Sequence, residues 1–427
     1  MLHYIVKGRG AMSAQEITGI LLSLTAVCSY INYKFIKLPK SIGITLVALF
    51  LTLLITLTGL LGWEVSRFAE LFVERMGFNE TFLHGMLSFL LFAGSLHINT
   101  TELYKYKLLI AAFATLSVLI STLLIGYATY GLLLLLGVAL PFYYCFVFGA
   151  LISPTDAITV IGVLKTSKLP KSLEMKIYGE ALFNDGMSIV LFFMALALAT
   201  GTQESLEVRE ITFYFLQEGG GGLIAGLIMG WLAAKLFATI EDHDLVIILT
   251  LALVTGGYTF ATSILDVSGP ICMAVTGLII GNSFQAEHVN KDTVQRVYAF
   301  WDLLDDILNA ILFVLIGFEF MSINFNWSIT LASLGAILIA LGARFVSVSI
   351  PSSFMAKFKN HDRSVPIIMT WGGLRGGISI ALALGITGEY RDTIVSITYA
   401  VVLFSIMVQG LTLKPLIKKL THNKAFN

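Results

Sequence analysis

The chain has 427 residues, of which 57% are apolar and 13% charged, and its 27 basic residues balance 27 acidic ones. Globular proteins average about 45–50% apolar and about 25% charged residues, so this composition excludes a water-soluble enzyme. The zero net charge gives no support to nucleic-acid binding, which needs a basic patch or stripe. Apolar stretches of about 20 residues recur along the chain, each long enough to cross about 30 Å of hydrocarbon, and they predict an all-α polytopic membrane protein.

Charged residues divide the apolar stretches into thirteen predicted membrane spans. The N-terminal residues 1–15 are mixed in polarity and lack the pattern of a cleaved signal peptide, so we expect none to be removed. The predicted spans are residues 16–33, 41–62, 81–98, 108–135, 142–165, 174–200, 210–237, 245–265, 267–284, 300–320, 327–350, 365–387 and 393–412.

The distribution of basic residues predicts the orientation of these spans. With thirteen spans, six basic residues fall on the side of the N-terminus and nineteen on the opposite side, counting span ends. Because cytoplasmic loops carry an excess of Lys and Arg, we expect the N-terminus outside and the C-terminus in the cytoplasm. The short basic tail of residues 413–427 is then expected at the lipid surface. The two remaining basic residues, Arg344 and Arg375, lie inside predicted spans and need partners there.

Two predicted spans contain a break near the middle. Residues 142–165 contain Ser153-Pro154-Thr155-Asp156, where proline removes a backbone donor and kinks or unwinds the helix. Residues 365–387 contain Gly372-Gly373-Leu374-Arg375-Gly376-Gly377, whose glycines weaken the helix at a comparable depth. Close helix packing would also explain these residues. The two spans are antiparallel in the expected topology, however, and antiparallel broken helices are typical of secondary transporters with inverted repeats. Spans four to six and eleven to thirteen are the expected repeat units.

Span 174–200 carries three polar residues, Glu180, Asn184 and Asp185. On a helical wheel Asn184 lies about 40° from Glu180, whereas Asp185 lies about 140° from it. We therefore expect Asp185 to face the break at Thr155 and Asp156, whose oxygens suit a small hard cation, and Glu180 to be free to pair with an arginine. Burial favours the protonated carboxyl and a bound cation opposes it, so a proton and a cation compete for the same oxygens. Competition combined with alternating access is sufficient for exchange.

These motifs resemble those of sodium/proton antiporters of the cation:proton antiporter-1 branch, which includes the NhaP type and the animal sodium/proton exchangers. The resemblance also covers Val267-Ser268-Gly269-Pro270 and Gly277-Leu278-Ile279-Ile280-Gly281-Asn282. It implies a multi-pass protein of the cell membrane that exchanges a monovalent cation for H+ and is no enzyme. Na+, Li+ and K+ all stay open as cargo, and no cofactor is expected. The resemblance further implies a homodimer in membrane lipid, with a core domain of residues 108–200 and 327–412 moving against a scaffold of residues 16–98 and 210–320.

The same resemblance implies roles for individual residues. Asp185 is the expected ion and proton carrier. Four further residues are expected to contribute to the ion site, namely Asp156, Thr155, Asn184 and Ser153. Asp156 and Thr155 would supply cation ligands beside Asp185. The Asn-Asp pair, where the electrogenic branch has two aspartates, resembles the electroneutral pattern of one proton per monovalent cation.

A structural ion pair and a charge at the helix crossing are also implied. Glu180 corresponds to a glutamate that pairs with an arginine of span eleven, here Arg344, and Arg375 would neutralise the facing helix ends. Many relatives have a serine near the ion where this chain has Ala181, so that ligand is either missing or replaced by water, Ser153 or Ser188.

Other interpretations of the sequence stay open at this stage. Asp302, Asp305, Asp306 and Asn309 share one helical face and predict a polar seam against the core domain, with a second ion site as the alternative. A sodium-driven carrier of an organic anion, bound by Arg375, would use the same fold. An intramembrane aspartyl protease would need two aspartates on adjacent spans, but the Gly-x-Gly-Asp surround of that family is missing. A passive channel is disfavoured because the polar groups are concentrated at one place.

Overall fold

The computed structural model describes residues 13–60, 86–98, 100–156, 160, 171–201, 213, 216–285, 290–322, 326–356 and 364–422. Within these residues all regular secondary structure is helical. The first half contains α2 (Ala14–Ile31), η1 (Asn32–Ile36), α3 (Lys40–Leu60), α6 (Leu87–Leu96), α7 (Thr100–Lys105), α8 (Lys107–Ala112), η3 (Phe113–Ser117), α9 (Val118–Leu136), α10 (Phe142–Ile152) and α12 (Lys171–Ala199). The second half contains η4 (Leu216–Gly220), α14 (Gly221–Phe237), α15 (His243–Ser263), α16 (Gly269–Gln285), α17 (Lys291–Phe318), η5 (Glu319–Ser322), α18 (Trp327–Ala356), α19 (Ser364–Trp371), α20 (Gly377–Leu384), α21 (Arg391–Phe404), η6 (Ser405–Gln409) and α22 (Gly410–His422).

The helices confirm an all-α polytopic membrane protein. In the described part of the chain, eight helical segments are long and apolar enough to cross a membrane, and α6, α10 and α16 are shorter apolar helices. Two boundaries differ clearly from the sequence prediction. The last helical segment continues through α22 to His422, ten residues beyond residue 412 and into the predicted tail. Helix α17 begins at Lys291 rather than near residue 300, because the Asn290 side chain accepts a hydrogen bond from the Asp292 amide at 3.0 Å and caps a polar first part of the helix. Residues 81–85 of the predicted span 81–98, and residues 157–159 and 161–165 of span 142–165, lie outside the described residues.

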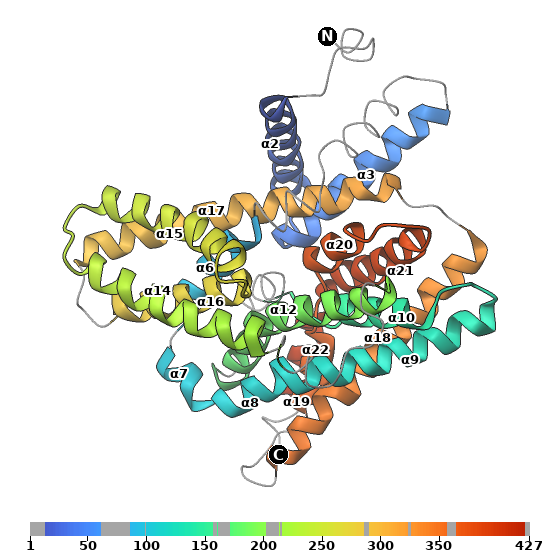
Figure 1. Ribbon diagram of the computed structural model, residues 1–427. Coiled ribbons are helices and arrows are strands. Elements are labelled where there is room, and N and C mark those ends of the chain that lie inside the picture. Colours follow the sequence, from blue (N-terminus) through green and yellow to red (C-terminus); the bar gives the residue numbers. More distant parts are fainter. Residues whose placement is uncertain are drawn as a thin grey trace.

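The helices pack in two groups. Helix α6 packs against α16 and α17, and α14 and α15 complete this group around a hydrophobic cluster that includes Phe92, Cys272 and Trp301. Helices α9, α10, α12, α18 and α21 form the second group through their mutual contacts. Figure 1 shows α14, α15 and α16 on one side of the molecule and α9, α10 and α18 on the other, with α12 near the centre of the view.

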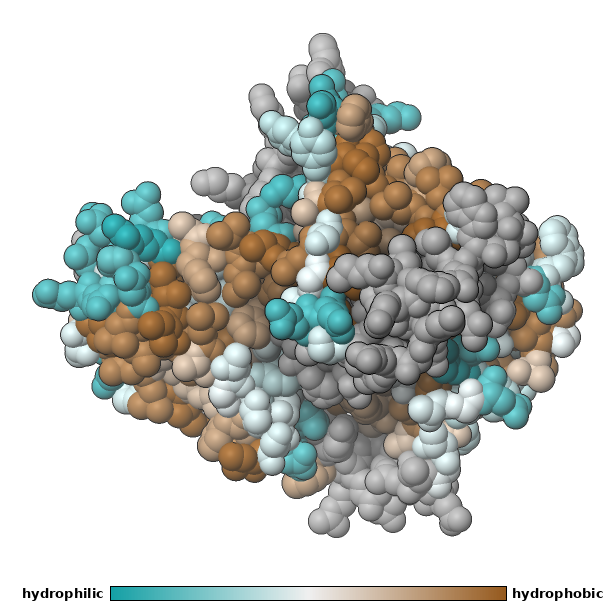
Figure 2. All heavy atoms as spheres, turned by 90° about the horizontal axis from the view of Figure 1, so that it is seen from above, coloured by the Kyte–Doolittle hydropathy of each residue, from teal (hydrophilic) through white to brown (hydrophobic). Residues whose placement is uncertain are grey.

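Large apolar side chains face outward over much of the surface. On α14, for example, Leu227, Ile228 and Trp231 are 43%, 54% and 53% exposed. Figure 2 shows hydrophobic residues spread over the face seen from above, with hydrophilic residues gathered mainly toward its periphery. A water-soluble monomer rarely exposes a contiguous apolar surface of this extent. The exposed apolar side chains therefore face lipid.

Candidate ion site

Both expected breaks are present, and they lie against each other. Helix α10 ends at Ile152, and the chain runs on without helical structure to Asp156. Helices α19 and α20 are separated by the non-helical residues 372–376. The Asp156 amide donates a hydrogen bond of 2.7 Å to the carbonyl of Leu374, which joins the two breaks through their backbones. Backbone groups freed by one break therefore find partners in the other, as a non-helical segment inside a membrane protein requires.

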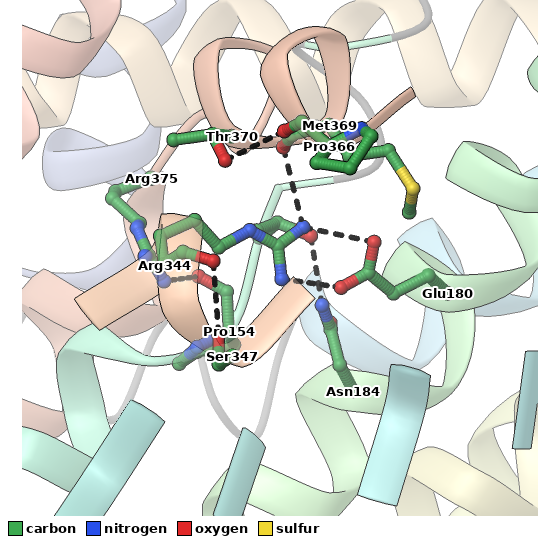
Figure 3. Close-up of polar contacts among 10 residues, drawn as sticks. Pro154, Glu180, Asn184, Arg344, Ser347, Pro366, Met369, Thr370 and Arg375 are labelled. Carbon is green, nitrogen blue, oxygen red and sulfur yellow. Dashed lines mark hydrogen bonds and ion pairs between the residues drawn. The ribbon is translucent and has the colours of Figure 1, made fainter. Parts of the chain in front are cut away.

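Arg375 provides a second link between the breaks. Its guanidinium donates a hydrogen bond of 2.8 Å to the carbonyl of Pro154 (Figure 3). Its backbone amide donates one of 2.8 Å to the Ser405 hydroxyl. The Pro154 carbonyl lies just beyond the C-terminus of α10, where the helix dipole is negative, so a cation is stabilised there. Arg375 is 3% exposed and its side chain is directed to the helix ends.

The glycine at the end of the second break leaves room for the first. A Cβ added at Gly376 would collide with the carboxylate of Asp156. The backbone of Gly376 is extended, with φ of −136°, so space rather than conformation requires glycine there.

We expect Gly376→Ala to destabilise the protein, because an added methyl group must displace the Asp156 carboxylate. Overpacking of this kind costs about 1–3 kcal/mol of folding free energy. The melting temperature of the purified protein measures this cost. Gly131→Ala on α9 is the control, since nothing lies within 4 Å of its added Cβ. A melting temperature that is unchanged in Gly376→Ala would show that the Asp156 carboxylate does not pack against Gly376.

Asp185 and its neighbour Asn184 are buried where α12 passes the first break. Asp185 is 4% exposed and Asn184 is fully buried. The Asn184 amide donates a hydrogen bond of 2.7 Å to the Thr155 hydroxyl, so the asparagine orients the threonine of the break. The Ser188 hydroxyl, one turn further along α12, donates to the carbonyl of Ala150 on α10. These bonds attach the carboxylate-bearing turn of α12 to the broken helix.

A small open cavity lies beside this region. One wall is formed by α12, the two breaks and the start of α20, and the other by α6 and by Leu312 of α17. Both carboxylates, Asp156 and Asp185, line the cavity, and Ser379 is a further polar residue in it. The opposite wall carries Leu87, Leu90 and Leu91. Both carboxylates thus line a cavity at the boundary between the two helix groups, and most of its other lining residues are apolar.

Ser153 has a different environment. Its hydroxyl donates a hydrogen bond of 2.7 Å to the carbonyl of Gly149 and accepts one of 3.1 Å from the Thr122 hydroxyl. These bonds direct Ser153 toward α9 and α10, and it is not among the described residues that line the cavity.

Glu180 and Arg344 form a buried ion pair. They are 1% and 3% exposed, and the guanidinium donates to both carboxylate oxygens, with a distance of 2.8 Å from Nη2 to Oε2 (Figure 3). Nη2 also lies 3.5 Å from the carbonyl of Met369, and a Cβ at Gly373 would lie 2.8 Å from Nε. The pair therefore joins α12 to α18 and supports the chain that leads into the second break.

Two acidic residues of α17 contact α3 and α6. Asp306 pairs with Lys40 of α3 at 2.6 Å, and Asp302 lies 2.9 Å from Nε2 of His97 at the end of α6. Both aspartates are more than half exposed. The expected seam against the core domain is thus, for these two residues, a set of contacts with α3 and α6.

Several contacts of the site give no signal in the sequence. Leu374 and Pro154 take part through backbone carbonyls, and Ser405 acts through a hydroxyl on a segment 30 residues from Arg375. Tyr178 lines the cavity two turns before Asp185 and is hydrogen-bonded to Gly94. Nothing in the sequence distinguishes Tyr178 from the other tyrosines, so only the structure identifies it.

A buried carboxylate beside two interrupted helices defines the class of secondary transporters with discontinuous helices. Comparisons with known proteins give the family. The transmembrane sodium/hydrogen exchanger family matches residues 21–419. The Na(+)/H(+) antiporter NhaP of Pseudomonas aeruginosa is 39% identical over 414 residues, which cover 95% of this chain and 96% of that protein. The Na(+)/H(+) antiporter NhaH of Halobacillus dabanensis is 33% identical over 409 residues, covering 94% and 97% of the two chains.

A solved structure supports the fold. The sodium proton antiporter MjNhaP1 of Methanocaldococcus jannaschii superimposes with a TM-score of 0.74 at 21% identity, covering 96% of this chain and 99% of that one. The chain therefore belongs to the sodium/hydrogen exchanger family. It is a multi-pass transporter of the cell membrane rather than an enzyme.

Proposed function

We propose that the protein is a Na+/H+ antiporter in which one carboxylate, Asp185, binds the cation and the proton in turn. The observation that carries this proposal is the position of Asp185, which is 4% exposed, lines the cavity and lies beside the meeting point of the two breaks. Family membership and the names of the relatives, which are Na(+)/H(+) antiporters, support the cargo. The cation would be held by Asp185, Asp156 and oxygens of Thr155, with Asn184 orienting the threonine.

Competition at one carboxylate requires no separate proton pathway. A cation must give up part of its hydration shell on entering the site, and the negative charge of Asp185 offsets this cost. Protonation of Asp185 removes that charge and hence the cation's main ligand. When Asp185 holds Na+ or H+, its buried charge is compensated. The empty site with ionised Asp185 has an uncompensated buried charge, so it rarely changes from one access state to the other, and cation transport is coupled to proton transport. One carboxylate carrying either one Na+ or one H+ predicts electroneutral exchange, which is tested by a rate independent of an imposed membrane potential.

The arrangement of the chain in the membrane belongs to the same proposal. We infer thirteen spans with the N-terminus outside, an inverted repeat, and a core of residues 108–200 and 327–412 that moves against a scaffold of residues 16–98 and 210–320. The two helix groups and the cavity along their boundary support this division. A homodimer in membrane lipid completes the proposal, and crosslinking in native membranes tests it.

Organic-anion transport has less support. Arg375, the cation that would hold the anion, already donates to the carbonyl of Pro154 and is not among the described residues that line the cavity. Uptake of labelled organic anions with and without a Na+ gradient tests this alternative.

We expect the half-saturating Na+ concentration to rise as pH falls, because a proton on Asp185 excludes the cation. The rise approaches about tenfold per pH unit below the proton affinity of the site, while the maximal rate changes less. Fluorescence dequenching in acid-loaded vesicles, on adding each monovalent cation at several pH values, measures both quantities and the cation preference. A half-saturating concentration independent of pH, with a falling maximal rate, would contradict competition at one site.

A further inference from the structure

Two tyrosine hydroxyls bridge the two helix groups. Tyr178 of α12 donates a hydrogen bond of 2.7 Å to the carbonyl of Gly94 on α6. Tyr399 of α21 donates one to the carbonyl of Ile316 on α17. Helices α6 and α17 belong to the first helix group, and α12 and α21 to the second. Each bond therefore crosses the boundary along which the proposed movement takes place.

Both acceptors are carbonyls near the C-terminus of a helix. Helix α6 ends at Leu96 and α17 at Phe318, so Gly94 and Ile316 are among the last four residues of their helices. Carbonyls at these positions lack the amide donors that a continuing α-helix would supply. Such a group in an apolar surrounding is costly without a donor, and a tyrosine hydroxyl from the other helix group can supply one.

The Tyr178 bond forms part of the cavity wall. Tyr178 precedes Asp185 by two helical turns, which places the two side chains on the same face of α12. Tyr178, Gly94 and Asp185 all line the cavity. This bond must break for α12 to slide along α6, and Asp185 moves with α12 because both are on one helix.

The Tyr399 bond lies farther along α17. Leu312 of the cavity wall is one turn from Ile316, and the Tyr399 side chain is 1% exposed. His97 at the end of α6 contacts Asp302 of α17, which shows where α6 ends along α17. Ile316 is 14 residues beyond Asp302, or about 21 Å along the helix. The two bonds thus hold the helix groups together at well-separated points.

We propose that Tyr178 and Tyr399 are latches, that is, positioning residues whose hydroxyls stabilise the access state seen here. The proposal rests on the proposed function, since it needs a core that moves against a scaffold. A hydrogen bond present in only one of two access states stabilises that state, and its loss shifts the equilibrium toward the other. A typical net hydrogen bond changes such an equilibrium by about 2- to 12-fold.

The test uses Tyr178→Phe, Tyr399→Phe and the double variant in proteoliposomes. Removing one hydroxyl is expected to change the half-saturating Na+ concentration in opposite directions on the two sides of the membrane, by up to about 2- to 12-fold. The double variant is expected to shift further. Tyr130→Phe is the control, because the Tyr130 ring packs within the second helix group against Phe142 and should leave both values unchanged.

A second readout does not depend on transport. Ile378 lines the cavity, so Ile378→Cys, made with the native cysteines replaced, reports access to an impermeant thiol reagent from each side. Tyr178→Phe should raise its labelling rate from one side and lower it from the other. The proposal is wrong if the folded Phe variants have the wild-type labelling rate and the wild-type half-saturating Na+ concentration on both sides, even if their melting temperature falls. Wild-type protein without exchange would instead refute the proposed function, and the labelling would still decide on the latches.

Discussion

Substituting Asp185 with asparagine is expected to abolish cation/proton exchange and to leave the protein folded. Asparagine keeps the shape of the side chain but has no proton to release near neutral pH and no negative charge for a cation. Asp185 is 4% exposed, and removing a charge from a buried site relieves desolvation, so stability should not suffer. Acid-loaded vesicles carrying the variant should show no more dequenching on addition of Na+ than empty vesicles.

Variants of two other carboxylates show whether the loss of exchange is specific to Asp185 or follows from removing any negative charge. Asp156→Asn is expected to impair exchange less completely, since its carboxylate would assist a cation held mainly by Asp185. Asp306→Asn is the matched control, because Asp306 is exposed and pairs with Lys40 away from the cavity. Should folded Asp185→Asn protein still dissipate a pH gradient when Na+ is added, Asp185 cannot be the exchange site.

Hydropathy and local breakers predict much of this fold because their effects are local. The break at Pro154 follows from a missing amide donor, and that at residues 372–377 from a run of glycines. Helix ends set by polar caps are harder to predict. The first part of α17, from Lys291, is polar enough to resemble a loop, and only the capping bond of Asn290 shows that the helix already begins there.

The site likewise has some features that the sequence predicts and others that it does not. The different orientations of Glu180 and Asp185 follow from helix periodicity, and the sequence alone predicts that these two carboxylates have different surroundings. The contacts that join the breaks could not be predicted, since the Leu374 and Pro154 carbonyls are available only once both helices stop. The bond from Tyr178 to Gly94 has the same origin. Its acceptor lies near the end of α6, which hydropathy locates only to within about two to four residues.

Removing either partner of the ion pair between Glu180 and Arg344 is expected to destabilise the protein strongly. Both side chains are at most 3% exposed, and the guanidinium donates to both carboxylate oxygens. Glu180→Gln leaves the Arg344 charge without its counter-ion, and Arg344→Ala leaves the Glu180 carboxylate in the same position. An uncompensated buried charge of this kind typically costs about 3–5 kcal/mol.

Lower melting temperatures and lower yields of folded protein in detergent are the expected results. The double variant Glu180→Gln with Arg344→Gln should lose less than the sum of the two single losses, because neither charge is then left alone. Arg391→Ala is the control, since the Arg391 side chain is 38% exposed and its pair with Asp392 is at the surface. Pairs of that kind contribute at most about 1 kcal/mol. If both single variants melt at the wild-type temperature, the pair does not hold α12 to α18, and the support of the second break must come from the bonds of Arg375.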